Sequence, residues 1–437
     1  MGHFIFGHNN FSLERASMTS SAYSRAKLLK ARRLMIVGLI ASVFGNHVVN
    51  AGFNALAASG TIAVSALVVL KTIEQIIVFA FPLYARIVGK ISPDKALIGV
   101  DLTEAGMSAI ALTVTLFRPD LAIACLFTYV LLDALIAPVS DLADKFYGAA
   151  IANVDEKAAL AFNATFYSWL AFLGFVIGGP IGSFFASISV EALLLTNVIL
   201  SLSGAGLRAF ARTTFAVQLI VDVDDEEYTV TGTRLPVKEF LVDLFASGPA
   251  SPLLSLLIRI ASAMTGELFL LWVAGVSAER SSHMNAFSGM GLVLAVFGVG
   301  AMIGPMAGRW LRKISSTRTI LLASALFSGA ILSLFAIIEV AVGAPFVLAL
   351  TFVLAVTILN RARLVVLETF RQTEFTGTRF VRIMSWSYSF GALGTILGLQ
   401  IGHWLHLSSQ PVACLFTGAA LWIFIGKVVN LQIKIPK

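Results

Sequence analysis

The chain has 437 residues, of which 58% are hydrophobic and only 13% are charged, and its formal net charge is +7. A soluble protein of this size usually carries about 25% charged residues, so the composition excludes that class and indicates an integral membrane protein. The two cysteines, Cys125 and Cys414, lie in apolar runs without the spacing of a disulfide framework or a metal site. We interpret them as small buried hydrophobic residues.

Apolar runs of membrane-spanning length occur twelve times along the chain. A helix needs about 17–25 such residues to cross about 30 Å of hydrocarbon. The sequence therefore predicts an all-α membrane protein with twelve transmembrane helices. The predicted spans are 34–58, 61–85, 96–117, 121–143, 160–186, 190–208, 253–276, 286–308, 319–339, 345–360, 383–405 and 411–433.

The basic residues fall almost entirely on one side of these spans. With the N-terminus inside, the inner segments hold 26 of the 31 Lys and Arg residues, the outer loops hold two, and three lie within spans. Such an asymmetry predicts that both termini are cytoplasmic. The positive charge then reflects topology and contact with anionic lipid, and we expect no nucleic-acid partner.

A long polar segment divides the spans into two blocks of six. The expected parts are a basic cytoplasmic N-terminus (1–33), an N-terminal six-helix bundle (34–208), a cytoplasmic central loop (209–252), a C-terminal six-helix bundle (253–433) and a cytoplasmic C-terminus (434–437). Alternating residues in the central loop suit either a small hairpin or a solvated linker.

The two blocks carry an internal repeat. Residues 82–95, PLYARIVGKISPDK, match 305–318, PMAGRWLRKISSTR, at an offset of 223 residues. Residues 173–182, LGFVIGGPIG, match 393–402, LGTILGLQIG, at an offset of 220 residues. Because the offsets agree closely, the sequence predicts two pseudo-symmetric bundles with a substrate site between them near the midplane.

Four stretches in this order resemble the major facilitator superfamily. They are ALIGVDLTEA after the first basic loop, AFNATFYSWLAFLGFVIGGPIG in the fifth span, GVGAMIGPMAGRWLRK in the eighth, and TFRQTEFTGTRFVRIMS before the eleventh. The resemblance covers about 34–433, and the order of parts is similar to the branch of the enterobactin exporter and macrolide-efflux-like proteins.

The resemblance implies a transporter of the bacterial cytoplasmic membrane, driven by the proton gradient and working as a monomer without a cofactor. Its implied activity is export of a siderophore, antibiotic or related amphipathic or polar molecule by alternating access. Protons, the small-molecule substrate and the bilayer are the expected partners. An uptake permease of the same fold is the alternative. A membrane-embedded enzyme is remote, because the chain has no nucleotide loop, HExxH or GxSxG.

Two sets of residues are candidates for gating or helix packing. Basic side chains after the second and eighth spans could bind helix C-termini or lipid, or only anchor the loops: Arg86, Lys90, Arg309 and Lys313. Small residues and a proline in the fifth and eleventh spans would let helices approach closely: Gly174, Gly178, Gly179, Pro180, Gly182, Gly394 and Gly398. In the family, the fifth-span pattern is typical of antiporters, although packing alone accounts for it equally well.

Polar residues in the first span form a candidate substrate surface. Asn46, Asn50 and Asn54 are spaced by four, which places them on one helix face. That face should avoid lipid, because unsatisfied polar groups are costly there. It could bind a polar substrate, or only hydrogen-bond to other helices. Trp386 and Tyr388 could similarly contact an aromatic cargo or pack.

A few charges within spans are candidates for coupling. Lys71 and Glu74 lie three residues apart near the middle of the second span, where a lone charge costs at least ~2.5–3.5 kcal/mol. They could form a structural ion pair, or Glu74 could carry a proton while Lys71 meets substrate. The repeat places Leu294 and Phe297 at these positions in the second block, which favours the functional reading. The other candidates are Asp133 and Glu267 for proton coupling and Arg259 for substrate binding.

Overall fold

The computed structural model describes residues 10–80, 83–84, 88, 91–154, 168–214, 244, 248–264, 266–280, 285–375, 377–406 and 410–431. These residues are helical apart from short connections, and ten segments among them are long and apolar enough to cross a bilayer. The predicted spans 61–85 and 383–405 are also largely helical, but neither is among the ten. The helix in the former is only 16 residues long.

Among the described residues, the N-terminal half of the chain contributes six long helical segments. The first is longer than its span because it begins in the polar N-terminal region. The helices are α1 (Asn10–Ala58), α2 (Val64–Phe79), α4 (Pro93–Phe117), α5 (Ala122–Val154), a π-helical segment η2 (Phe172–Ile177) that continues into α7 (Gly178–Ile188), and α8 (Val190–Thr214). A short 3-10 turn, η1 (Pro119–Leu121), precedes α5.

The C-terminal half repeats this pattern of long helices after the short 3-10 turn η3 (Gly248–Ala250). Its helices are α10 (Pro252–Ala263), α11 (Glu267–Arg280), α12 (Ala286–Ile314), α13 (Thr317–Val342), α14 (Phe346–Glu374), α15 (Gly377–Trp404) and α16 (Val412–Leu431).

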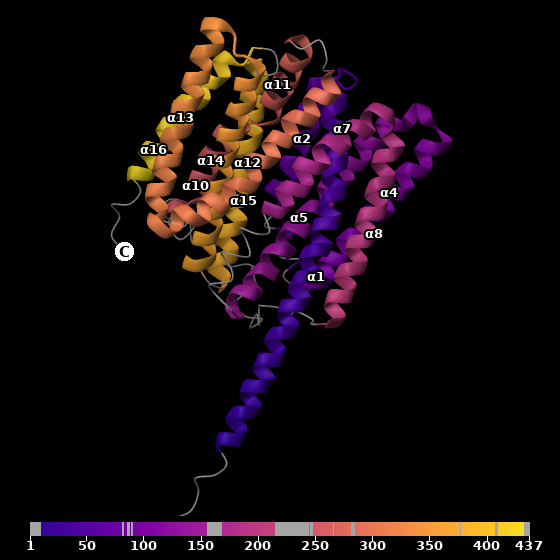
Figure 1. The fold of residues 1–437 in the computed structure, drawn as a ribbon, viewed down its shortest axis with the longest axis vertical. Coiled ribbons are helices and arrows are strands. Elements are labelled where there is room, and N and C mark those ends of the chain that lie inside the picture. The colour runs from indigo at the N-terminus through magenta and orange to yellow at the C-terminus, as the bar shows by residue number, and fades with distance from the viewer. Residues whose placement is uncertain are drawn as a thin grey trace, which may run out of the picture.

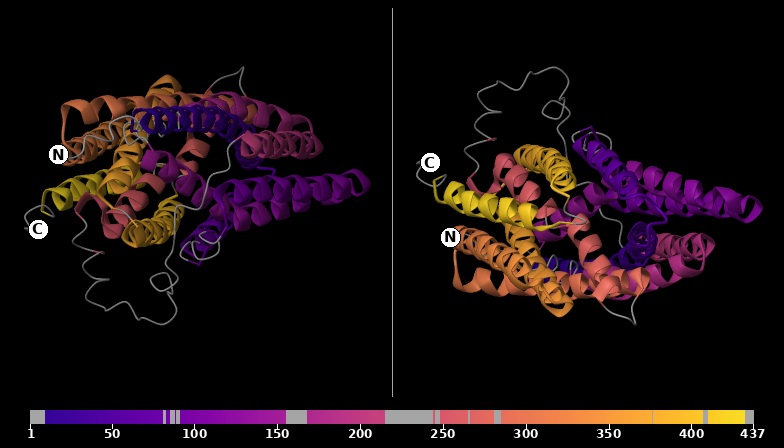
Figure 2. Two further views of the ribbon diagram at one scale, coloured as in Figure 1. Left: turned by 90° about the horizontal axis from the view of Figure 1, so that it is seen from below. Right: turned by 90° about the horizontal axis from the view of Figure 1, so that it is seen from above.

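The two halves lie side by side. In Figure 1 the indigo to magenta helices occupy one side and the orange to yellow helices the other, and the start of α1 projects from one face of the bundle. The end-on views of Figure 2 show the same division. We call the face from which α1 projects the α1 face. The halves meet where α2 packs against α15 and where α7 packs against α12.

Hydrogen bonds also cross this meeting line. Ser389 of α15 donates to the carbonyl of Phe79 at 2.8 Å, and Gln400 donates to the hydroxyl of Thr72 at 3.1 Å. On the other side, Ser168 donates to the carbonyl of Met302 at 2.9 Å. The contact between the halves is therefore polar as well as apolar.

One apolar cluster joins the halves on the side away from the α1 face. It combines Val48, Val49 and Phe53 of α1 with the stretch 268–274 of α11 and with Leu294 of α12. A smaller cluster near the α1 face is built mainly from the N-terminal half and includes Met35 and Leu142. The larger cluster therefore closes the far side of the bundle.

The repeated glycine motifs lie on equivalent helices that pack in equivalent ways. A Cβ at Gly182 would lie 2.2 Å from the carbonyl oxygen of Val48, on α1. A Cβ at Gly394 of α15 would lie 2.3 Å from the carbonyl oxygen of Leu256, on α10. Both helices thus approach their partners too closely for any larger residue.

The remaining candidates of this packing set lie at similar contacts. An added Cβ would meet the ring of His47 at Gly174, Phe44 at Gly178, Leu294 at Gly179 and the carbonyl of Ile260 at Gly398. Pro180 lies in α7, with its Cα 3.4 Å from a Cβ built at Gly291. Arg309 and Lys313 are exposed near the end of α12. Arg86, Lys90, most of the central loop and the segment 434–437 lie outside the described residues.

The tenth predicted span, 345–360, is too short. Helix α14 continues to Glu374, so that Arg361, Arg363 and Arg371 lie on the helix and not in an inner loop. The apolar-run criterion ended the span at the first cation. These arginines are accommodated because they face a cavity or buried polar partners instead of lipid.

The seventh predicted span is interrupted. Helix α10 ends at Ala263 and α11 begins at Glu267, so Arg259 and Glu267 lie on separate helices. The sequence places these two residues two turns apart within one predicted span, and the break between the helices falls between them. Gly266, between the two helices, accepts backbone hydrogen bonds from Phe269 and Leu270 and so starts the new helix.

Candidate functional site

A cavity of about 400 Å³ lies within the C-terminal half and reaches the N-terminal half. Helix α14 lines it from Phe352 to Arg371, and α10, α11, α12 and α15 form the rest of the C-terminal wall. Gln75 and Val78 of α2 and Asp141 of α5 line the opposite wall. The lining residues of α2 and α10 lie toward the α1 face, whereas Phe269, Phe352 and Val353 belong to the large apolar cluster, so the cavity reaches from that side of the bundle to the cluster.

Among the described residues, four arginines line this cavity, against two carboxylates. The cations are Arg259, Arg361, Arg363 and Arg371, and the acids are Asp141 and Glu368. The lining is therefore positive overall.

Glycines on α12 set the position of Arg361. Gly300, Gly304 and Gly308 are spaced by four and each lies against α14, with a Cβ at Gly304 only 2.5 Å from the Cβ of Arg361. The guanidinium carbon of Arg361 lies 5.7 Å from the ring centre of Phe297, a cation–π distance. The close approach of α12 and α14 thus places a cation beside an aromatic wall.

The other three arginines differ in how they are held. Arg371 donates to the hydroxyl of Ser255 at 2.5 Å and lies 3.9 Å from Glu368. Arg363 is buried, donates to Ser324, Ser328 and Asn360, and lies 3.7 Å above the ring of Trp422. Arg259 is exposed at the cavity and lies beside Gly391 and Gly394 of α15.

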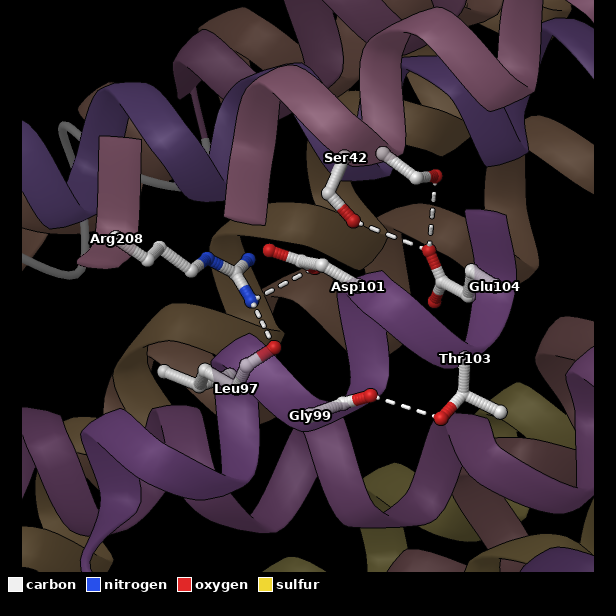
Figure 3. A network of polar contacts seen from close by, with 8 residues as sticks. Ser42, Leu97, Gly99, Asp101, Thr103, Glu104 and Arg208 are labelled. Atoms are coloured by element: carbon white, nitrogen blue, oxygen red, sulfur yellow. Dashed lines mark hydrogen bonds and ion pairs between the residues drawn. The ribbon is translucent and has the colours of Figure 1, made fainter. Parts of the chain in front are cut away.

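The N-terminal half contains a buried charged network (Figure 3). Arg208 of α8 donates to Asp101 of α4 at 3.0 Å and to the carbonyl of Leu97 at 3.1 Å. One turn further along α4, Glu104 accepts from Ser42 at 3.1 Å and from Ser201 at 3.4 Å. The network ties α4 to both α1 and α8, and its two carboxylates are at most 3% exposed.

A second, neutral network extends from Asn46. Tyr129 of α5 donates to the side-chain oxygen of Asn46 at 2.9 Å, and the amide of Asn197 donates to both Tyr129 and Ser108 at 2.7 Å. Asn50 donates to the backbone of Asn46 at 3.0 Å. The buried side-chain oxygen of Asn54 has no hydrogen-bond partner among the described residues. None of these asparagines is among the residues that line the cavity.

Lys71 and Glu74 form the ion pair that their spacing suggested. Their charged atoms are 2.9 Å apart, and the side chains are 12% and 17% exposed. Neither residue lines the cavity, although Gln75 does.

Asp133 is a buried acid with a different environment. It is 9% exposed, and its Oδ1 has no hydrogen-bond partner within the described structure. It lies within electrostatic range of Glu104, Glu74 and Lys71. Among the other candidates, Arg259 and Tyr388 line the cavity, Trp386 packs on Phe390 with ring centres 6.2 Å apart, and the side chain of Glu267 is outside the described part.

Several residues that the fold brings together were not among the candidates from the sequence. Arg208, Arg361, Arg363 and Arg371 fall in the predicted inner segments, and Asp101 and Glu104 were not singled out. One available signal was the i, i+7 and i, i+10 spacing of Arg361, Glu368 and Arg371, which places them broadly on one helix face. For Arg208, whose partners come from another helix, the sequence offers no comparable signal.

No family model and no curated protein matches the sequence. Solved structures match the fold over nearly their whole length. A bacterial homologue of the iron transporter ferroportin, in an outward-facing state, has a TM-score of 0.66 at 14% identity, covering 92% of this chain and 99% of that one.

Two further solved structures give the same result. The human organic anion transporter MFSD10 has a TM-score of 0.62 at 14% identity and covers 92% of this chain and 99% of that one. The E. coli fucose:proton symporter FucP has a TM-score of 0.63 at 13% identity, covering 94% of this chain and all of that one. FucP is described as a major facilitator superfamily transporter, so the chain has the fold of that superfamily. These proteins are transporters and not enzymes, and they do not single out the enterobactin-exporter branch.

Proposed function

We propose that the protein is a secondary transporter of the major facilitator type, with twelve spans in two six-helix halves, that exports a small amphipathic or polar molecule in exchange for protons. The observation that carries the proposal is the cavity bordered by both halves on the α1 face, with an apolar cluster closing the far side. An arrangement open to one face at a time is what alternating access requires.

The cargo is a siderophore, an antibiotic or a related metabolite, and it moves out of the bacterial cytoplasm. With the termini cytoplasmic, as the basic residues predict, the cavity faces the cytoplasm and is placed to load an exported molecule. Its lining supports a cargo of mixed character, because arginines alternate with Phe297, Phe352 and Tyr388. The direction of transport rests on the resemblance of the sequence to exporters.

The proton is carried by Asp133 in this mechanism. Support comes from its burial, from its unpartnered Oδ1, and from the neighbouring charges of Glu74 and Glu104. A buried acid in a membrane span is energetically costly, so such residues are rare and usually have a function. Proton relays are one such function. Glu74 and Glu267 remain secondary candidates, the first because Lys71 already balances its charge.

Inverted membrane vesicles with an acidic interior and a pH-sensitive dye provide the test. A panel of siderophores and antibiotics is added, and we expect at least one compound to dissipate the gradient and to accumulate inside the vesicles. Asp133→Asn should abolish the dye response, whereas Asp120→Asn, at an exposed position on the other face, should not. If no compound gives either signal, proton-coupled export of these classes is wrong.

Uptake by the same fold is the second candidate. The likeness to a fucose:proton symporter favours it, because that protein has the same fold and couples its substrate to protons by symport. Accumulation of the substrate in intact cells expressing the protein, abolished by Glu74→Gln, would support uptake. Depletion from the same cells supports export.

A further inference from the structure

We infer that the cavity binds small organic anions that carry an apolar body, with Arg259 and Arg361 holding the acidic group and the phenylalanine wall holding the body. This inference rests on the proposed transport function and names its substrate class. It separates anionic cargo from the neutral and cationic molecules that the same fold could carry.

The charge of the lining is the first argument. Arg371 lies beside Glu368 and Arg363 is buried on Trp422. Arg259 and Arg361 are the less buried pair, and both are on the cavity surface. Among the described residues, the lining holds four arginines and two carboxylates, so a bound anion would offset a local excess of positive charge.

The shape of the cations is the second argument. A guanidinium presents a planar fork of donors that matches a carboxylate, sulfonate or phosphate group in two parallel hydrogen bonds. Arg259 lies directly against two glycines of α15, since an added Cβ would lie 3.5 Å from its Cγ at Gly391 and 3.0 Å from its Cβ at Gly394. The absence of side chains at these positions lets Arg259 lie along α15 at the cavity surface.

The apolar wall is the third argument. Phe269 and Phe352 have ring centres 5.3 Å apart and both line the cavity, as does Phe297 beneath Arg361. Because Phe269 and Phe352 are only 1% and 4% exposed, an aromatic or branched body would pack mainly on Phe297 while its acidic group meets the arginines. The volume of about 400 Å³ is in the range of sites for small molecules.

The test is equilibrium binding to the purified full chain in phosphatidylcholine nanodiscs, without a proton gradient. The probes are naphthoate and naphthamide, which share an apolar body and differ in charge. We expect naphthoate to bind about tenfold or more tightly than naphthamide. Arg259→Gln and Arg361→Gln should each remove most of this preference, and Arg361→Lys should keep part of it.

Arg118→Gln is the matched control, since Arg118 is exposed and is not among the residues that line the cavity. Equal affinity for the two probes, or a preference unchanged in Arg259→Gln and Arg361→Gln, would overturn the inference. The Arg361→Lys variant guards against a loss caused by misfolding, and monodisperse elution of each variant is required.

A second arm identifies the source of the anion. Replacing part of the phosphatidylcholine by phosphatidylglycerol should leave naphthoate binding unchanged if the ligand is a soluble anion. Competition by the lipid would assign the same arginines to a phospholipid headgroup and overturn a soluble cargo. The binding assay uses no proton gradient, so the two experiments can fail separately. If naphthoate binds but no compound gives a vesicle signal, proton-coupled transport is wrong and the anion site stands. If only neutral compounds give a vesicle signal, transport stands and the inferred preference for anions is wrong.

Discussion

The two halves hold buried cations in different ways. In the N-terminal half, Arg208 is fully buried and pairs with Asp101, and the surrounding polar groups bind one another. In the C-terminal half, Arg363 is equally buried but rests on Trp422, and the neighbouring arginines of α14 face an open cavity. Both halves have close glycine contacts between helices, but they differ in the partners of their buried arginines. The two halves can therefore share a packing arrangement and still have separate roles.

The largest expected effect tests the two buried arginines. Arg208→Leu leaves Asp101 buried without its cation, and we expect it to lower the free energy of unfolding by about 3–5 kcal/mol. Arg363→Met should cost less, about 1–3 kcal/mol, because no carboxylate depends on it among its described contacts. Denaturant unfolding in detergent micelles measures both. Equal losses would show that the halves bury charge in the same way.

The next effect tests the shared scaffold. Gly182→Ala and Gly394→Ala place a Cβ against a backbone carbonyl in each half, and each should cost about 1–3 kcal/mol of stability through overpacking. Gly206→Ala and Gly275→Ala are the matched controls, since nothing lies within 4 Å of an added Cβ there. They should be neutral or stabilising by up to about 1 kcal/mol. A loss of stability in only one of these two variants would show that the two halves do not share this close helix contact.

The third effect tests the charge pair that the second half lacks. In the double variant Lys71→Leu with Glu74→Phe, the N-terminal half takes the residues found at Leu294 and Phe297. Folding should be kept, because an internally balanced pair contributes little net stability. Transport should fall about tenfold, equivalent to ~1.4 kcal/mol in the barrier. Vesicle transport and thermal unfolding are measured together, and intact transport would show the pair to be structural.

The sequence predicted the helical membrane fold because the length of an apolar run is a local property. It also predicted the Lys71–Glu74 pair, whose partners are one turn apart. It did not predict the bonds of Arg208 or Asn46, because their partners lie 107 and 83 positions away in the chain. The span ending at 360 was wrong for a related reason. An arginine at position 361 signals the end of a span unless a neighbouring helix shelters it, and Gly304 of α12 provides that shelter.

The smallest effect concerns the neutral network of the N-terminal half. Tyr129→Phe removes the hydroxyl that donates to Asn46 and accepts from Asn197. A loss of about 1 kcal/mol in unfolding free energy is expected, since each such bond has a modest net value. Thr113→Ala, at an exposed position bonded only to its own helix, is the control and should change stability by less than about 0.5 kcal/mol.

The same variant decides what Asn46 does. If its amide only links α1 to α5, Tyr129→Phe lowers stability and leaves the affinity for cargo unchanged. If the first span binds substrate, as its stripe of asparagines predicts, freeing Asn46 from Tyr129 changes affinity at constant proton coupling. Binding of naphthoate to Tyr129→Phe separates these outcomes. A changed affinity would extend the site from the arginine-lined cavity to the neutral network of α1 and α5, and the contrast between a half that only buries its polar groups and a half that binds cargo would fail.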